Sequence, residues 1–260
     1  MSIDRRMLMR GALACACCIK AGAAIGSDTP AHGGAAAAHW SYEGEGSPEK
    51  WGELQADFRV CQLGLEQTPI DLGNGIRGDA GSVEYDYKQV PLRILNNGHT
   101  IQVNADPGSA CVIGGTRYEL LQFHFHHPSE HLLAGKGFDL ECHFVHKAST
   151  GALAVTGVFI RPGAPNKVLG AVFDQMSAKE GPETRIDDMI DISAVLPKNG
   201  GYFRYMGSLT TPPCSEGLTW TVYKEPAEAS VEQIRKFAAL FPNNARPVQK
   251  RNRRFLIDAS

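Results

Sequence analysis

Long apolar runs are missing from this chain of 260 residues. A weakly apolar stretch runs from Gly11 to Ile19, but it is far shorter than the ~20 residues that a membrane-spanning helix needs. Lys20 then interrupts it. The sequence therefore predicts no membrane span.

A strong charge of either sign is also missing. The chain carries 26 basic and 28 acidic residues, a formal net charge of -2, so nothing favours a nucleic acid or an anionic membrane as partner. No internal repeat and no second domain are visible. What the sequence has in quantity is turn formers, 28 Gly and 15 Pro, which favour a strand-rich fold over a helix bundle.

The N-terminal segment indicates export. Asp4-Arg5-Arg6-Met7-Leu8-Met9 resembles a twin-arginine signal, and residues 26–38 form a Gly- and Ala-rich linker. We expect a leader and linker over residues 1–38, one catalytic domain over residues 39–260, and a periplasmic location.

Two other interpretations of this segment remain open. Lys20 within the apolar stretch is compatible with a cytoplasmic tail. Cys15, Cys17 and Cys18 could suggest a lipoprotein anchor, although the residues before them fit such a site poorly.

Beyond the linker, short apolar runs alternate with turn signals, as in a sheet of many strands. The predicted strands are Val90–Leu95, Thr100–Val103, Tyr118–Phe125, Leu140–His146, Leu153–Ile160 and Leu218–Tyr223. Helical periodicity is clearest over Asn166–Met176 and Ser230–Leu240. In the second, Ser230 and Gln233 have the spacing of a capping box.

The most informative segment is Gln122-Phe123-His124-Phe125-His126-His127. Side chains alternate faces along a strand, so His124 and His126 point the same way while Phe123 and Phe125 point into a core. Two imidazoles placed in this way can bind one metal ion.

A second predicted strand can supply a third imidazole. In Leu140–His146, the residues Glu141, His143 and Val145 share a face, and the gap after His126 allows an antiparallel turn. Three neutral histidines with one open position describe a catalytic zinc site, although copper, nickel or cobalt would also bind. Isolated histidines such as His32 and His39 are interpreted as ordinary core or surface residues.

At this point the sequence resembles the alpha-class carbonic anhydrases, from about His39 to Asp258. The matching segments stand in the family's order: His39-Trp40-Ser41-Tyr42, Gln67-Thr68-Pro69-Ile70-Asp71, Asn97-Gly98-His99, Gln122 to His126, Ser129-Glu130-His131, Glu141 to His146, Gly207 to Glu216, Trp220 and Arg246-Pro247. One such motif would be weak, but the ordered set is highly specific.

The resemblance implies a mainly β domain with a large central, twisted, mostly antiparallel sheet and short surface helices. It also implies zinc bound by His124, His126 and His143, and a reversible hydration of carbon dioxide to bicarbonate and a proton. Carbonic anhydrase is itself the reference example of a three-histidine zinc site that generates hydroxide. The zinc-bound hydroxide would be the nucleophile.

Three further residues receive catalytic roles from the resemblance. Thr210 and Glu130 would orient the hydroxide through a chain of hydrogen bonds. His99, in a turn that suits a mobile exposed side chain, would be the proton shuttle.

The supporting residues follow in the same way. Those that would hold the zinc ligands are Gln122 and Glu141; those that would line the substrate pocket are Val145, Val155, Leu209, Thr211 and Trp220; those that would hold the water chain are Tyr42, Asn97 and Gln102. Gln102 departs from the family's usual asparagine, which puts that contact in doubt. His127 is interpreted as structural and not as a fourth ligand.

Four cysteines lie beyond the leader, and their spacing alone assigns no pairs. The resemblance implies a disulfide between Cys61 and Cys214, which would fix the loop that carries Thr210. Cys142 would then be a buried thiol, and Cys111 is left over.

Three other functions would be compatible with a histidine cluster of this kind, and each requires a feature of its own. A cupin-type metalloenzyme would use Glu130 as a ligand, but it needs a further histidine downstream, and no histidine follows His146. A zinc-free binding domain would lack a ligand histidine, and a zinc-storage protein would carry His-rich tracts. The family implies inhibition by sulfonamides and small anions, in a monomer or a homodimer.

Overall fold

The computed structural model describes residues 39–198 and 200–259, so the predicted leader lies outside the described residues. The strands are β1 Ile76–Arg77, β2 Val83–Asp86, β3 Val90–Asn96, β4 Ile101–Asn104, β5 Ala110–Ile113, β6 Thr116–His126, β7 Leu140–Ala148, β8 Leu153–Pro162, β9 Thr184–Ile190, β10 Tyr202–Ser208, β11 Glu216–Tyr223, β12 Ala227–Ala229 and β13 Ile257–Ala259. The α-helices are α1 Trp51–Leu54, α2 Val60–Leu63, α3 Lys167–Asp174 and α4 Val231–Leu240, and the 3-10 helices are Gly44–Gly46, Ala56–Phe58 and Ile192–Val195.

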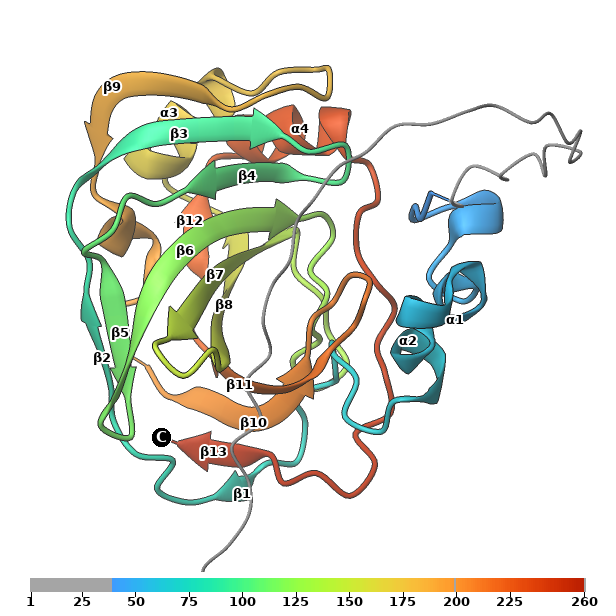
Figure 1. The fold of residues 1–260 in the computed structure, drawn as a ribbon. Helices are drawn as coiled ribbons and strands as arrows, with labels where there is room; N and C mark the ends of the chain where they lie inside the picture. The colour runs from blue at the N-terminus through green and yellow to red at the C-terminus, as the bar shows by residue number, and fades with distance from the viewer. Residues whose placement is uncertain (1–38, 199, 260) are drawn as a thin grey trace, which may run out of the picture. The chain divides into compact units, whose positions relative to one another are not determined.

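The described residues form a 13-stranded sheet, whose main path is β1-β13-β10-β11-β8-β7-β6-β4-β3-β9. Figure 1 shows this path from β9 and β3 at one end to β13 and β1 at the other. Most neighbours are antiparallel, and β8 pairs in parallel with both β11 and β12. The predicted mainly β fold is confirmed.

The two faces of the sheet bury different clusters. On one face, Phe123 and Phe125 of β6 pack with residues of α3 and α4, and Phe125 lies 5.0 Å from the ring of Phe173. On the other, Val145 and Val155 pack with Trp220 of β11. The alternation of side chains along β6 and β7 therefore separates an apolar, helix-covered face from the face that carries the histidines.

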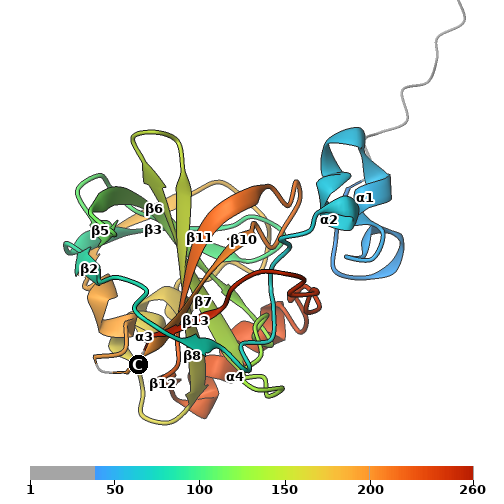
Figure 2. The same ribbon diagram turned by 90° about the horizontal axis from the view of Figure 1, so that it is seen from below.

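Both predicted helices exist, and α4 begins at its predicted cap, Ser230. The Asn166 side chain accepts hydrogen bonds from two backbone N–H groups at the start of α3. Ser230 and Gln233 form the capping box of α4. The prediction of helix to Met176 was wrong, since α3 ends at Asp174, and α1 and α2 were not predicted because four residues carry too little periodicity. Figure 2 shows α1 and α2 next to each other. None of the helices within the described residues is long and apolar enough to span a membrane.

Candidate metal centre and active site

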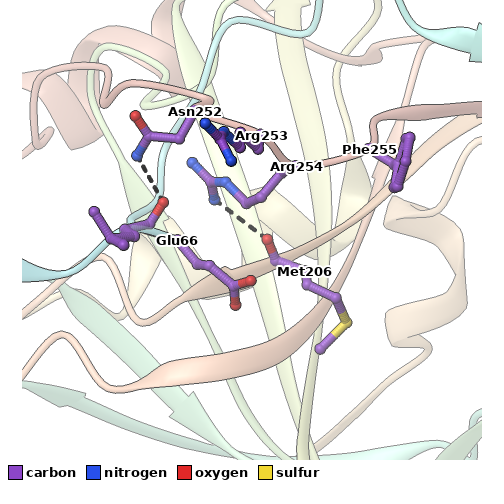
Figure 3. A pocket seen from close by; sticks show the side chains of 7 residues that line it. Glu66, Met206, Asn252, Arg253, Arg254 and Phe255 are labelled. Atoms are coloured by element: carbon purple, nitrogen blue, oxygen red, sulfur yellow. Dashed lines mark hydrogen bonds between the residues drawn. The ribbon is translucent and has the colours of Figure 1, made fainter.

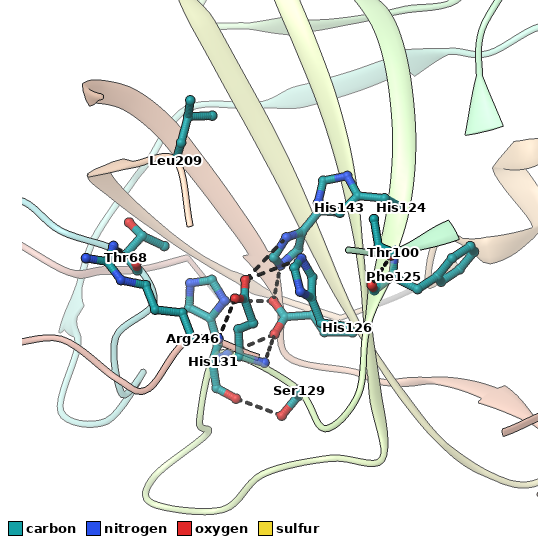
Figure 4. Close-up of polar contacts among 12 residues, drawn as sticks. Thr68, Thr100, His124, Phe125, His126, Ser129, His131, His143, Leu209 and Arg246 are labelled. Carbon is teal, nitrogen blue, oxygen red and sulfur yellow. Dashed lines mark hydrogen bonds and ion pairs between the residues drawn. The ribbon is translucent and has the colours of Figure 1, made fainter. Parts of the chain in front are cut away.

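Three histidine side chains converge on the β6–β7 ladder. His124 and His126 alternate with phenylalanines on β6, and His143 of β7 lies directly opposite His124 in the register. One ligand atom from each ring lies within 4.8 Å of the other two. Figure 4 shows these imidazoles pointing toward one another and the Phe125 ring pointing away. The predicted convergence is confirmed.

The remaining nitrogen of each ring is engaged by the protein. His124 Nδ1 donates to Gln122 Oε1 at 2.8 Å, and His143 Nε2 donates to Glu141 Oε1 at 2.9 Å. His126 Nδ1 donates to the backbone carbonyl of Asn244 at 2.7 Å. A neutral ring that donates from one nitrogen presents a lone pair on the other. Nε2 of His124, Nε2 of His126 and Nδ1 of His143 are thus free to bind a metal.

Burial keeps these rings neutral. It lowers the pKa of His124 well below its usual range, and the neighbouring imidazoles add to the effect. Burial likewise lowers the pKa of His126 to about 3 and lowers that of His143. A neutral imidazole is the form that binds metal, so the site is ready for a cation at neutral pH.

Two buried polar atoms test whether a metal fits. Among the described residues, His126 Nε2 and Glu130 Oε2 are buried without a hydrogen-bond partner, and they lie 3.4 Å apart. Buried polar groups are normally satisfied, so an unpartnered nitrogen aimed into a histidine cluster indicates a ligand position. The donor set of three imidazoles fits zinc.

Glu130 lies beside the triad and is fully buried. Its Oε1 accepts a hydrogen bond from the backbone N–H of Arg246 at 2.9 Å. Burial raises the pKa of Glu130 well above its usual range, while the Arg246 N–H and the Thr210 hydroxyl oppose that shift. Thr210 is only 5% exposed and follows β10. The structure thus brings the two predicted orienting residues together.

The loop after β10 is held by covalent and polar contacts. The predicted disulfide is confirmed, because Cys61 and Cys214 are bonded across 153 residues of sequence. The N–H of Cys214 donates to the Thr211 carbonyl at 2.9 Å. Arg246 Nη2 donates to the Cys61 carbonyl at 2.8 Å. The buried arginine therefore links the disulfide to the backbone that holds Glu130.

A buried chain behind Glu141 was not assigned from the sequence. His131 Nδ1 lies 2.7 Å from Glu141 Oε1, and His131 Nε2 lies 2.6 Å from the hydroxyl of Tyr205. Glu141 Oε2 also accepts the backbone N–H groups of Glu130 and His131 at 2.9 and 2.8 Å. This network fixes the Glu141 carboxylate and, through it, the ring of His143. The Ser129-Glu130-His131 motif contained the signal for it.

Asn244 was also missed. Its side chain donates to the carbonyls of His99 and Phe125 at 2.9 and 3.0 Å and accepts the N–H of His127 at 2.7 Å. Together with its carbonyl bond to His126, these contacts connect the metal site with the turn of His99. Asn244 lies 118 residues from His126 in the sequence, so no local sequence pattern could have predicted their contact.

His124 and His126 line a cavity of about 110 Å³, together with Tyr42, Trp40, Asn97, His99, Thr100, Gln102, Gln122 and Thr211. The His99 side chain, expected to be exposed, is less exposed than expected. Its ring is half-buried and stacks on Trp40 at a centroid distance of 3.5 Å and on His39 at 5.0 Å. Burial, followed by the charge of His39, lowers the pKa of His99.

The three residues predicted to hold water all line this cavity. Asn97 Oδ1 accepts the N–H groups of His99 and Thr100 at 3.0 and 2.9 Å, so it also shapes the turn. Asn97 Nδ2 donates to Gln102 Oε1 at 3.3 Å. Gln102 Nε2 donates onward to Asn104 Oδ1 at 2.7 Å.

An apolar wall stands beside the triad. Val145, Val155 and Trp220 belong to one buried cluster, and Leu209 packs against it. The Trp220 ring lies 4.9 Å from that of His143. The predicted wall residues are thus neighbours.

Other residues lie apart from this site. His127 Nδ1 donates to the Pro242 carbonyl at 2.9 Å, which agrees with a structural role. Cys111 and Cys142 are free buried thiols. Cys142 is buried as predicted, in the same cluster as Phe123 and Phe125.

A larger cavity, of about 590 Å³, lies elsewhere and is lined by Leu65, Glu66, Met206, Asn252, Arg253, Arg254 and Phe255. Figure 3 shows Arg254 bonded to the Met206 carbonyl, at 3.2 Å. Its lining includes no histidine and no cluster of metal-binding groups, so we place the chemistry in the smaller cavity.

Comparison with known proteins decides the family. The family model for eukaryotic-type carbonic anhydrases matches residues 46–258. The chain belongs to the alpha carbonic anhydrases. A carbonic anhydrase from Nostoc sp. (strain PCC 7120 / SAG 25.82 / UTEX 2576) is 48% identical over 227 residues, which cover 85% of this chain and 86% of that protein.

Two further carbonic anhydrases support the assignment. One from Pectobacterium carotovorum is 41% identical over 220 residues, covering 84% of this chain and 90% of that protein. The alpha-carbonic anhydrase from Thermovibrio ammonificans, solved with the inhibitor sulfanilamide, has a TM-score of 0.82 and 42% identity, covering 85% of this chain and 99% of that chain. The cupin interpretation is therefore excluded, and the histidine triad lies in a carbonic anhydrase fold.

Proposed function

We propose that this carbonic anhydrase catalyses the reversible hydration of carbon dioxide with a zinc ion held by His124, His126 and His143. The observation that carries the proposal is the set of three buried, neutral imidazoles, each oriented by a separate hydrogen bond. Bound zinc would supply a Lewis acid that makes hydroxide available near neutral pH, a property for which carbonic anhydrase is the reference case.

Thr210 and Glu130 would orient the nucleophile. A carboxylate at Glu130 can accept a hydrogen bond from the Thr210 hydroxyl, because its Oε2 has no hydrogen-bond partner among the described residues. The Thr210 oxygen then has only acceptor capacity left for the attacking group. Such a chain leaves one productive orientation and so lowers the entropy cost of the attack.

The apolar wall would hold the substrate. Carbon dioxide is small and carries no net charge, so it requires surface without strong hydrogen-bonding groups. Val145, Val155, Leu209 and Trp220 provide that surface next to His143. Thr211 at the edge of the cavity would bind the polar product.

His99 would take up the proton that the reaction releases. Its imidazole shares the cavity with His124 and His126, and Tyr42, Asn97 and Gln102 line the space between with polar groups. Waters on such groups can carry a proton to an imidazole, which can accept it and release it again.

Sulfonamides and small anions would inhibit by binding at the open zinc position. The Thermovibrio ammonificans relative was solved with sulfanilamide, which supports this expectation. Titration with sulfanilamide during carbon dioxide hydration tests it, and full activity at saturating inhibitor would contradict it.

We further propose that residues 1–38 direct the catalytic domain, 39–260, to the periplasm. The Cys61–Cys214 disulfide supports an oxidising compartment. Replacing Arg5 and Arg6 by lysine should retain the protein in the cytoplasm, as cell fractionation would show. Unchanged export would exclude a twin-arginine signal.

The central experiment is stopped-flow carbon dioxide hydration combined with zinc analysis, on the full chain and on His143→Ala. We expect about one zinc per chain and rapid hydration, both lost in the variant because one ligand of three is gone. His127→Ala is the matched control, since the His127 ring bonds to the Pro242 carbonyl and not to the triad, so the variant should keep both properties.

The outcomes separate the rival functions. Zinc bound without hydration would indicate a binding domain and direct attention to Thr210 and Glu130. A folded chain without zinc would contradict the proposal.

A further inference from the structure

The turn that carries His99 is joined to a second loop. Asn96, the last residue of β3, is 6% exposed and bonds to both segments. Its Nδ2 donates to the Ser177 carbonyl at 2.9 Å and its carbonyl accepts the N–H of Gly181 at 3.1 Å. Its Oδ1 accepts the N–H of Gly98 at 2.9 Å. One buried side chain therefore fixes the loop between α3 and β9 against the His99 turn.

This arrangement brings the carboxylate of Glu180 against the backbone of the turn. A Cβ atom on Gly98 would come within 2.9 Å of Glu180 Oε2 and 3.2 Å of its carboxyl carbon. Gly98 has a φ of +86°, a conformation that suits glycine. The absence of a side chain at Gly98 thus allows a negative charge to lie one residue from His99.

His39 and Glu180 act on the protonation of the His99 ring in opposite directions. Among the described residues, His39 lowers the pKa of His99 and Glu180 raises it. Burial of the ring against Trp40 also disfavours the charged form and has the largest effect on the pKa of His99. Glu180 is exposed and opposes both effects.

We infer that Glu180 is a positioning residue that acts through His99, where it stabilises the imidazolium formed when the shuttle accepts a proton. The inference rests on the proposed shuttle role of His99. The proton moves from the water at the reaction centre to a ring nitrogen of His99 and then to a buffer base, and the Glu180 side chain takes no part in the transfer. A half-buried, stacked ring would otherwise accept that proton poorly.

The test combines an NMR titration of the His99 ring with pH profiles of kcat and kcat/KM, on the full zinc-loaded enzyme at low ionic strength. The His99 signal is assigned by its loss in His99→Ala. Glu180→Gln should move the ring's titration and the rising limb of kcat to lower pH, and Glu180→Lys should move both further. We expect kcat in the plateau to fall roughly two-fold for Glu180→Gln, the effect of one exposed charge acting through water.

Two readouts separate this effect from a structural one. The kcat/KM profile should not move, since proton release follows the departure of bicarbonate. The differences should vanish in ~1 M salt, where the screening length is about 3 Å. Glu183→Gln is the matched control, because that carboxylate in the same loop binds Arg93 and Asn104.

Two results would overturn the inference, and they differ in meaning. An unmoved His99 titration in both Glu180 variants would show that the carboxylate does not act on the ring. A His99 titration that moves while the kcat profile stays would overturn the shuttle role itself, and with it this part of the proposed function.

Discussion

The active site has two halves that are built differently. The histidine triad lies on β6 and β7, where backbone pairing sets the register and alternation sets the direction of each side chain. Thr210 and His99 lie on loops, whose positions depend on a disulfide, a buried arginine and an asparagine. The difference teaches that the histidine triad follows from local sequence, whereas the groups proposed to orient the nucleophile and to carry the proton depend on distant contacts.

The largest effect is expected when the disulfide that supports the loop-built half of the site is removed. Replacing Cys61 and Cys214 together by serine should lower the free energy of unfolding by about 3–5 kcal/mol, since the bond closes a long loop. Urea denaturation measures this, and zinc analysis should show the metal retained. Reduction of the wild-type protein is the control. An unchanged midpoint would contradict a stabilising role for the bond.

The strand-built half should respond to acid through His146 of β7. Its Nε2 accepts the Tyr87 hydroxyl at 2.7 Å, and burial lowers its pKa to about 4. The unfolded ring, with a pKa of about 6.5, binds the proton more readily, so stability falls as the pH drops from about 6.5 through 4. The loss approaches about 3 kcal/mol.

Unfolding measured across this pH range should show a shallower slope for His146→Gln than for wild type. The control is Thr211→Ala, which changes no titratable group and should keep the wild-type slope. Equal slopes for all three proteins would show that His146 does not contribute.

Within the loop-built half, Thr210→Ala should reduce kcat/KM by about 100-fold, the loss expected when one preorganised orienting group is removed. Zinc content should stay at the wild-type value. Thr210→Ser should recover most of the rate, and Thr211→Ala, at the neighbouring threonine, should lose much less. Equal losses for the two threonines would argue against a special role for Thr210.

The smallest effect concerns the orientation of a ligand. Gln122→Ala should weaken zinc binding by about ten-fold or somewhat more, because His124 loses the acceptor that holds its ring. Competition with a chelator measures the affinity. Gln102→Ala, at a glutamine of the same cavity that does not bond to a ligand, should bind zinc normally. Equal zinc affinities for the two variants would show that the Gln122 hydrogen bond does not contribute to zinc binding.

Residues of the strand-built half could be placed from the sequence more readily than residues of the loop-built half. Alternation along β6 and β7 was enough to bring three histidines together and to place Phe123 and Phe125 in the opposite core. The resemblance supplied Gln122, Glu141 and the disulfide. The stacking of His99 on Trp40 could not be predicted, because it depends on how an N-terminal segment packs against a turn some 60 residues away.

The contacts of Asn244 and Tyr205 were missed for a similar reason. The hydrogen bond that His126 donates to the backbone carbonyl of Asn244 cannot be predicted from residue type, since every residue has a carbonyl. The hydroxyl of Tyr205 reaches His131 across 74 positions. Such pairs follow from tertiary packing, which composition and periodicity do not encode.

Asn244 has a consequence for the choice of residue at its position. The carbonyl that holds His126 is supplied by any amino acid, whereas the amide that ties His99 and Phe125 is supplied only by asparagine at that reach. A library with each of the twenty amino acids at position 244 would therefore give one order of variants by zinc content and another by hydration rate. We expect many of these variants to bind zinc equally well. Only the protein with asparagine should keep the wild-type rate of carbon dioxide hydration.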